Sequence, residues 1–183
     1  MADRHVIMGN IENISGFVEE GVRWEDILPM RFQRTSCENL YNQGSQDVIV
    51  PMGEVCLRKG FLDLETIAET VVSRGLRLVV WGRVENRHIR KRLQKLLLKG
   101  KGKIRVVDAH LERCSTDFHN LISNAALASF PNTEEGGPDM VYDLLRHGIP
   151  SVYSDACGYP SHQSAPEISS RERDWSSALD SIL

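Results

Sequence analysis

The sequence lacks the residue patterns of a metal site, a secreted protein and a membrane-spanning protein. Its four cysteines, at positions 37, 56, 114 and 157, show neither the short paired spacing nor the neighbouring histidines of a zinc site. We therefore expect no metal, and reduced thiols in a cytoplasmic protein. No long apolar run occurs, and residues 1–21 have no apolar core flanked by basic residues, so we expect neither a signal peptide nor an integral membrane segment.

Positive charge is not in excess either. The formal net charge is -3 over 183 residues, which gives no support to a general nucleic-acid or anionic-membrane binder. The densest basic stretch runs from Arg87 to Arg92 and continues at Lys95 and Lys99. It also carries apolar residues at helical spacing, namely Ile89, Leu93, Leu96 and Leu97. This pattern favours a helix with a solvated basic face, and we expect no nucleic-acid partner.

With 41% hydrophobic residues, the chain can bury one good core. Short apolar runs predict strands at Val48–Met52, Leu76–Trp81, Ile104–Val107, Leu127–Phe130 and Ile149–Ser154. Segments with helical character lie between and after them, at Leu62–Ser73, Arg87–Leu98, Thr116–Asn124, Asp139–His147 and Asp174–Leu183. Strands that alternate with helices predict an α/β fold, a Rossmann-like doubly wound parallel sheet with helices on both faces.

The domain boundaries follow from the same alternation. Residues 1–47 show no clean period, and we expect them to form an N-terminal segment separate from the domain that follows. Residues 48–183 are expected to form one Rossmann-like domain. Within it, residues 161–173 are rich in serine, proline and charge, which predicts an irregular stretch before the last helix.

The segment from Pro131 to Asp143 carries the most chemical information. It places Glu135 in a loop and Asp143 on the helix that follows, on either side of a glycine-proline turn that contains Gly136 and Gly137. The loop comes directly after a predicted buried strand, at the edge where open α/β sheets bind their ligands. Because a helix amino-terminus offers free N–H groups and a positive dipole end to an anion, a phosphorylated ligand is expected.

A second group of residues follows the first confident strand. Gly53 opens a turn that runs through Arg58 and Lys59 to Gly60 and leads into a helix. The glycines let the backbone come close to a ligand, and Lys59 can place a compact positive charge on a phosphate. A basic pair before a helix is also typical of an ordinary solvated loop.

Other side chains have simpler interpretations. Trp81, at a strand end beside Gly82, is expected in the core rather than as a stacking platform for a base. The histidines at positions 110, 119, 147 and 162 have no partner at a recognisable spacing, and each is expected to be an ordinary surface or capping residue.

Taken together, these motifs resemble the carboxyl-terminal, donor-binding domain of GT-B fold glycosyltransferases, in the retaining group called glycosyltransferase family 4 or glycosyl transferases group 1. The family has a glycine after a strand and a lysine-glycine pair six residues later, matched by Gly53 and Lys59-Gly60. It then has a proline, a glutamate-glycine pair, a second acid eight positions on and a glycine-x-proline. Here these are Pro131, Glu135-Gly136, Asp143 and Gly148-Ile149-Pro150.

The resemblance implies a role for each matching residue. Lys59 would hold the diphosphate of a UDP- or GDP-sugar and stabilise the charge of the leaving nucleotide, with Arg58 and Gly53 beside it. Glu135 would lie by the donor sugar, with Gly136 and Gly137 leaving room for it. Asp143 would take the ribose hydroxyls, although an aspartate replaces the usual glutamate. Glu54 stands where the family has an arginine, which places full donor affinity in question.

The resemblance also implies a retaining transfer without metal or other cofactor. Within the N-terminal segment 1–47, it makes Val6–Phe17 a remnant of the family's interdomain segment. It further implies that the acceptor domain is missing from this chain or supplied by another polypeptide, so the chain alone would be inactive. One alternative is a degenerate Rossmann-like nucleotide-binding or interaction module without transfer activity, which Glu54 and Asp143 favour. A dinucleotide enzyme is disfavoured because no G-x-G-x-x-G follows the first confident strand.

Overall fold

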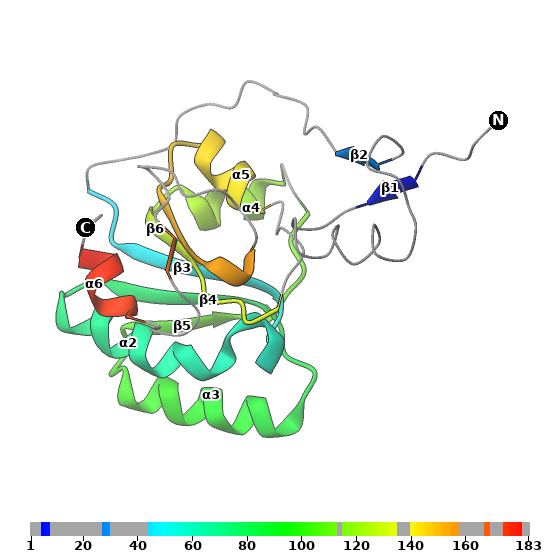
Figure 1. The fold of residues 1–183 in the computed structure, drawn as a ribbon. Coiled ribbons are helices and arrows are strands. Elements are labelled where there is room, and N and C mark those ends of the chain that lie inside the picture. The colour runs from blue at the N-terminus through cyan, green and yellow to red at the C-terminus, as the bar shows by residue number, and fades with distance from the viewer. Residues whose placement is uncertain are drawn as a thin grey trace.

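A six-stranded, fully parallel sheet forms the centre of the computed structural model (Figure 1). The structure describes residues 5–7, 27–29, 44–112, 115–134, 140–157, 167–168 and 174–180. The strand order is β5-β4-β3-β6-β7-β8. The strands are β3 (Asp47–Glu54), β4 (Arg77–Arg83), β5 (Ile104–Val107), β6 (Ala125–Phe130), β7 (Ser151–Ser154) and β8 (Glu167–Ile168). Five of them are the strands that the sequence predicts.

Helices cover both faces of this sheet. They are α2 (Leu64–Ser73), α3 (Arg87–Lys99), α4 (Thr116–Ile122), α5 (Met140–Arg146) and α6 (Trp175–Asp180). Helices α2, α3 and α6 contribute to one hydrophobic core, and α4 and α5 contribute to the other. Figure 1 shows α2 and α3 below the sheet and α4 and α5 above it. The doubly wound α/β prediction is therefore confirmed.

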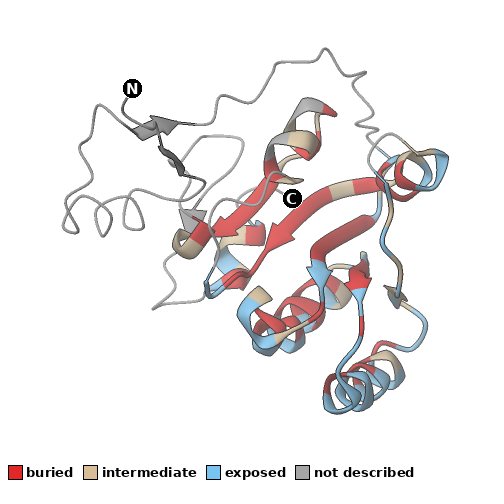
Figure 2. Ribbon diagram, turned by 90° about the vertical axis from the view of Figure 1, so that its right-hand side faces the viewer, coloured by how far each residue is buried: buried red, intermediate tan, exposed pale blue. Residues whose placement is uncertain are grey.

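The central strands are apolar on both sides because each side faces a core. In β3, Val48 and Val50 point into the core under α2 and α3, while Ile49 between them points into the opposite core. In β4, Leu78 likewise points into the core shared with α2 and α3, and Val79 points into the opposite core. This is why these strands appear as continuous apolar runs rather than alternating ones, and Figure 2 shows the central strands as buried.

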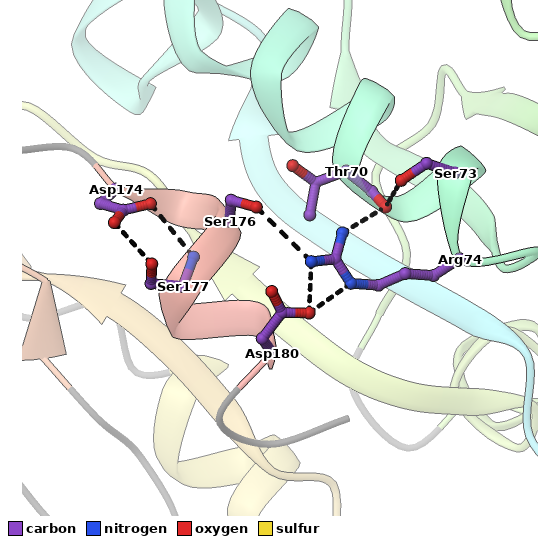
Figure 3. A network of polar contacts seen from close by, with 7 residues as sticks. All are labelled: Thr70, Ser73, Arg74, Asp174, Ser176, Ser177 and Asp180. Carbon is purple, nitrogen blue, oxygen red and sulfur yellow. Dashed lines mark hydrogen bonds and ion pairs between the residues drawn. The ribbon is translucent and has the colours of Figure 1, made fainter.

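The last helix, α6, is held against α2 by both apolar and polar contacts. Trp175 and Leu179 are buried in the core that α2 shares. Arg74, at the end of α2, donates from Nη1 to the Thr70 carbonyl at 2.8 Å and forms an ion pair with Asp180 (Figure 3). Helix α6 therefore lies on the same face of the sheet as α2.

One feature differs from the sequence prediction, and a second lies in the N-terminal segment for which the sequence predicted no element. The stretch from Ser161 to Arg173, predicted as irregular, contains the short strand β8, where Tyr153 pairs with Glu167 and Ser154 with Ile168. A strand of two residues is defined by its neighbour β7 rather than by a local pattern. Near the N-terminus, β1 (His5–Ile7) and β2 (Ile27–Pro29) form a separate parallel pair.

None of the helices within the described residues has the length and apolar character needed to cross a bilayer.

Candidate functional site

A cavity of about 490 Å³ opens at the carboxyl ends of the central strands. It lies beyond β3 and β4, beside the loops that follow β5 and β6, and at the start of α5. Its lining residues are Pro51, Met52, Gly53, Lys59, Trp81, Ala109, His110, Leu111, Glu112, Asn132 and Met140. The cavity therefore occupies the edge where parallel α/β sheets place their ligand sites, as the sequence predicts.

The end of β3 is bent at the mouth of this cavity. Pro51 pairs with Trp81 and Gly53 with Gly82, so Met52 has no counterpart on β4 and the strand bulges there. Gly53 follows the bulge with φ +68°, a conformation that favours glycine. The bulge turns the chain into the short 3-10 helix Leu57–Lys59, which carries the basic pair predicted from the sequence.

The turn after β3 and the loop after β6 are joined directly. The amide N–H of Thr133 donates to the Arg58 carbonyl at 2.9 Å, and the Thr133 hydroxyl donates to the same oxygen at 3.1 Å. Gly60, with φ +82°, lies so close to Pro131 that an added Cβ would be 1.7 Å from its carbonyl oxygen. The two segments that carry the predicted site are therefore brought together in one place.

Lys59 lines the cavity and is half-buried. Burial lowers the pKa of its ammonium group below the usual 10.5, and the neighbouring positive charge of Arg58 lowers this pKa further. The Glu54 carboxylate acts in the opposite direction and raises the pKa of Lys59. A partly desolvated cation attracts an anion more strongly than one in bulk water does, because the local dielectric constant is lower.

Arg58 does not line the cavity. Its side chain is exposed, and its Nη1 group approaches the carbonyl oxygen of Glu134 at 3.5 Å. Arg58 therefore contributes its backbone carbonyl and its long-range charge to the site.

Asn132 is a residue of this site that the sequence analysis did not identify. It lines the cavity and is 2% exposed, and its Oδ1 atom has no hydrogen-bond partner among the described residues. The Ser154 hydroxyl donates to the Asn132 carbonyl and holds the loop in place. In the sequence, the only sign of a role for Asn132 is its position next to Pro131, directly after a buried strand.

Cys157 supports this loop from beneath. Its thiol contacts the Ser154 hydroxyl at 3.7 Å and donates to the Phe130 carbonyl at 3.8 Å. Burial raises the pKa of the Cys157 thiol to about 11, so the thiol remains protonated at neutral pH. A protonated, buried thiol is a packing group and a poor nucleophile.

The far side of the cavity is formed by the loop after β5. Asp108 fixes this loop by accepting a hydrogen bond from the Val84 amide at 2.9 Å and from Arg90 Nη1 at 2.8 Å. Both contacts lower the pKa of the Asp108 carboxyl group. His110 and Glu112, which follow Asp108 on this loop, are exposed and also line the cavity.

Other predicted residues lie elsewhere. Glu135, Gly136 and Gly137 fall outside the described residues. Asp143 lies in the first turn of α5, half-buried, and does not belong to the lining of the cavity, although Met140 of the same turn does.

Two of the remaining sequence interpretations are confirmed, and one holds only in part. Trp81 is buried and packs against Phe118 with ring centroids 5.8 Å apart, and one edge reaches the cavity. His110 is exposed, as expected. His147, expected on the surface or as a capping residue, directly follows α5 but is buried, and its ring centroid lies 5.7 Å from that of His119. His162 lies outside the described residues.

The described residues offer no group of three or more His, Cys, Asp or Glu side chains that could hold a metal ion. The chemistry that they support is recognition of an anion by Lys59, beside a largely apolar cavity.

Comparison with known proteins gives strong matches to solved structures. The chain is similar to the lipopolysaccharide outer core galactosyltransferase WaaB, with a TM-score of 0.71 and 13% identity over 99% of this chain and 53% of that one. It is also similar to WaaG, a glycosyltransferase involved in lipopolysaccharide biosynthesis, with a TM-score of 0.67 and 14% identity over 98% and 53% of the two chains. Neither a protein-family model nor a curated protein matches the sequence.

A further match is a single domain. The C-terminal domain of the glycosyl transferase group 1 family protein LpcC from Francisella tularensis aligns with 74% of this chain and 74% of its own length, at a TM-score of 0.58 and 15% identity. The fold of this chain is therefore that of the C-terminal, Rossmann-like domain of GT-B glycosyltransferases, as the sequence motifs predict. The chain spans about half the length of the WaaB and WaaG structures.

Proposed function

We propose that this chain is the donor-binding domain of a glycosyltransferase and that its cavity holds a nucleotide-diphosphate sugar. The observation that carries the proposal is the position of Lys59, half-buried in the wall of a 490 Å³ cavity at the carboxyl edge of the sheet. Its turn is hydrogen-bonded to the loop that leads toward Glu135.

Lys59 is proposed to bind the diphosphate of the donor. When the bond from the sugar to the diphosphate breaks, negative charge grows on the leaving nucleoside diphosphate, and a fixed ammonium group stabilises it. Partial burial strengthens this attraction. The reaction then needs no metal to neutralise the leaving group.

Except for Asn132, the remaining contacts are proposed from the sequence resemblance. Glu135 is proposed to lie by the donor sugar, with Gly136 and Gly137 leaving room for it, and Asp143 to bind the ribose hydroxyls. The buried Oδ1 of Asn132 is an acceptor that a hydroxyl group of the ligand can satisfy, and burial makes an unsatisfied acceptor costly. Transfer with retention of configuration and a UDP- or GDP-sugar as donor complete the proposal.

The test is calorimetric titration of the purified chain with UDP, GDP, ADP and NAD. A charge-assisted contact contributes roughly 1.5 to 3 kcal/mol, so Lys59→Ala is expected to weaken binding of the preferred nucleoside diphosphate at least tenfold. Lys91→Ala is the matched control, because Lys91 is exposed on α3 and does not line the cavity. Equal dissociation constants for wild type and Lys59→Ala would contradict the proposal.

A second candidate is a nucleotide-binding module without transfer activity. Glu54 favours it, because this exposed acid lies next to the cavity where the resembling family has an arginine. The two candidates differ in what happens to the donor. Slow hydrolysis of a nucleotide sugar by the chain, abolished in Lys59→Ala, supports the transferase, because a pure binding module does not break the bond between sugar and diphosphate.

A further inference from the structure

Helix α3 concentrates positive charge on one side of the molecule. Residues 87–103 contain eight lysines and arginines and no aspartate or glutamate, in a chain whose net charge is -3. The eight are Arg87, Arg90, Lys91, Arg92, Lys95, Lys99, Lys101 and Lys103. The negative net charge of the whole chain therefore conceals a strongly basic element.

Side chains on the inner face and the flanks of α3 contact other residues of the domain. Ile89, Leu93 and Leu96 are buried in the core, as their spacing predicts. On one flank Arg90 pairs with Asp108 at 2.8 Å. On the other, Lys99 pairs with Glu65, and the Arg92 guanidinium lies over the Phe61 ring at 5.1 Å.

The outer face of α3 carries a different set, which we call the basic ridge: Arg87, Lys91, Lys95 and Leu98. Steps of four, four and three residues place these side chains in one line opposite the buried face. All are exposed, and the three cations have no ion pair with any carboxylate of the described residues. Figure 2 shows this outer side of α3, the lowest helix in the view, as largely exposed.

Leu98 is the unusual member of the ridge. It is 81% exposed, the most exposed of the large hydrophobic residues that the structure describes. Beside the ridge, a hollow of about 290 Å³ between α2 and α3 is lined by the buried apolar residues Phe61, Leu64 and Leu96 and by the charged residues Glu65, Arg92, Lys95 and Lys99. The ridge thus combines three cations that form no ion pair with a described carboxylate and one exposed apolar side chain, Leu98.

We propose that the basic ridge docks this domain onto an anionic phospholipid surface. Phosphate headgroups complement Arg87, Lys91 and Lys95, and Leu98 can enter the boundary between headgroups and acyl chains while the long lysine side chains keep their charges among the headgroups. A nucleic acid would satisfy the cations but offers no apolar environment to Leu98. The ridge is separate from the cavity, so the proposal does not depend on the proposed function.

The test is sedimentation of the purified chain with phosphatidylcholine vesicles, with and without phosphatidylglycerol. We expect binding only to the anionic vesicles, and weakening of that binding as ionic strength rises from about 0.1 M to about 1 M. The double variant Lys91→Gln, Lys95→Gln should lower the partition coefficient at least about tenfold. Leu98→Gln alone should lower it about fivefold, because its apolar contact is lost while the charge is unchanged.

The matched control is the double variant Arg83→Gln, Arg105→Gln, which removes the same charge from exposed positions outside α3. It should bind anionic vesicles almost as wild type does, and all variants should keep the wild-type circular dichroism and melting curve. Equal losses in the two double variants, equal binding to neutral vesicles, or tighter binding to duplex RNA than to anionic vesicles would each overturn the proposal.

Discussion

Gly60 determines how closely two loops of the candidate site approach each other. It adopts φ +82°, and its missing side chain leaves the space that the Pro131 carbonyl occupies. The hydrogen bonds from Thr133 to the Arg58 carbonyl depend on that approach. A single glycine therefore couples the position of Lys59 to the loop after β6.

We predict that Gly60→Ala destabilises the protein by more than about 2 kcal/mol, because left-handed strain adds to a clash with backbone atoms. Gly75→Ala is the control, since Gly75 has the same φ of +82° but open space around its Cβ position, and should cost only about 1 kcal/mol. Urea denaturation measures both. Similar losses in the two variants would show that the close approach to Pro131 does not matter.

The pH dependence of binding should report on Lys59. Its pKa lies below 10.5 because of burial and the charge of Arg58, and only the protonated form attracts phosphate. Affinity for a nucleoside diphosphate should therefore fall as pH rises, starting at lower pH than for an ordinary lysine. Calorimetric titration across alkaline pH measures this.

Arg58→Gln provides the internal comparison. Removing a like charge raises the pKa of Lys59, so the alkaline fall in affinity should move to higher pH, and it should vanish in Lys59→Ala. An alkaline fall that is unchanged in both variants would assign the titration to another group.

Helix α6 depends on contacts with α2 that are distant in the sequence. Arg74 joins the two helices through the Thr70 carbonyl, the Ser176 hydroxyl and the Asp180 carboxylate. The helix itself is only six residues long, and a helix of this length is not stable alone in water. Its place is therefore held by Arg74 together with the buried Trp175 and Leu179.

We predict that Arg74→Ala lowers the free energy of unfolding by about 1 to 2 kcal/mol, a modest loss because Asp180 is partly exposed. Arg83→Ala is the comparison, because Arg83 makes only a 3.9 Å contact with Glu85 and both side chains are exposed. It should change stability by less than about 0.5 kcal/mol. Chemical denaturation followed by tryptophan fluorescence distinguishes the two, and equal losses would contradict a specific role for Arg74.

The proposed reaction requires a binding site for the acceptor as well as one for the donor. Donor and acceptor must be held together in a cleft that excludes water, and the chain spans only about half of the WaaB and WaaG structures that it resembles. We therefore predict that the purified chain binds a nucleoside diphosphate but transfers sugar poorly or not at all. The assay should follow both sugar on an acceptor and free nucleotide, because slow hydrolysis of the donor remains possible. Efficient acceptor glycosylation by residues 1–183 alone would contradict this prediction.

Local sequence determines most of the fold. The apolar runs of β3 and β4 have to be buried on both faces of the sheet. The spacing of Ile89, Leu93 and Leu96 places all three on one face of α3, which must then be the buried face. These patterns show which side chains must be buried, so the five longer strands of the central sheet, its helices and the sheet edge where the cavity opens could be predicted. The turn that carries Lys59 could be placed for the same reason, since Gly53 and Gly60 mark its ends.

Contacts between distant segments are decided only by the tertiary structure. The burial of Asn132 and His147, the exposure of the Arg58 side chain and the pairing of β8 with β7 all depend on which loops meet after the sheet has formed. The same is true of the basic ridge, because the sequence shows how many cations α3 carries but not which of them find a carboxylate. A local pattern specifies which face of an element is buried, whereas the partner of a polar side chain depends on residues far along the chain.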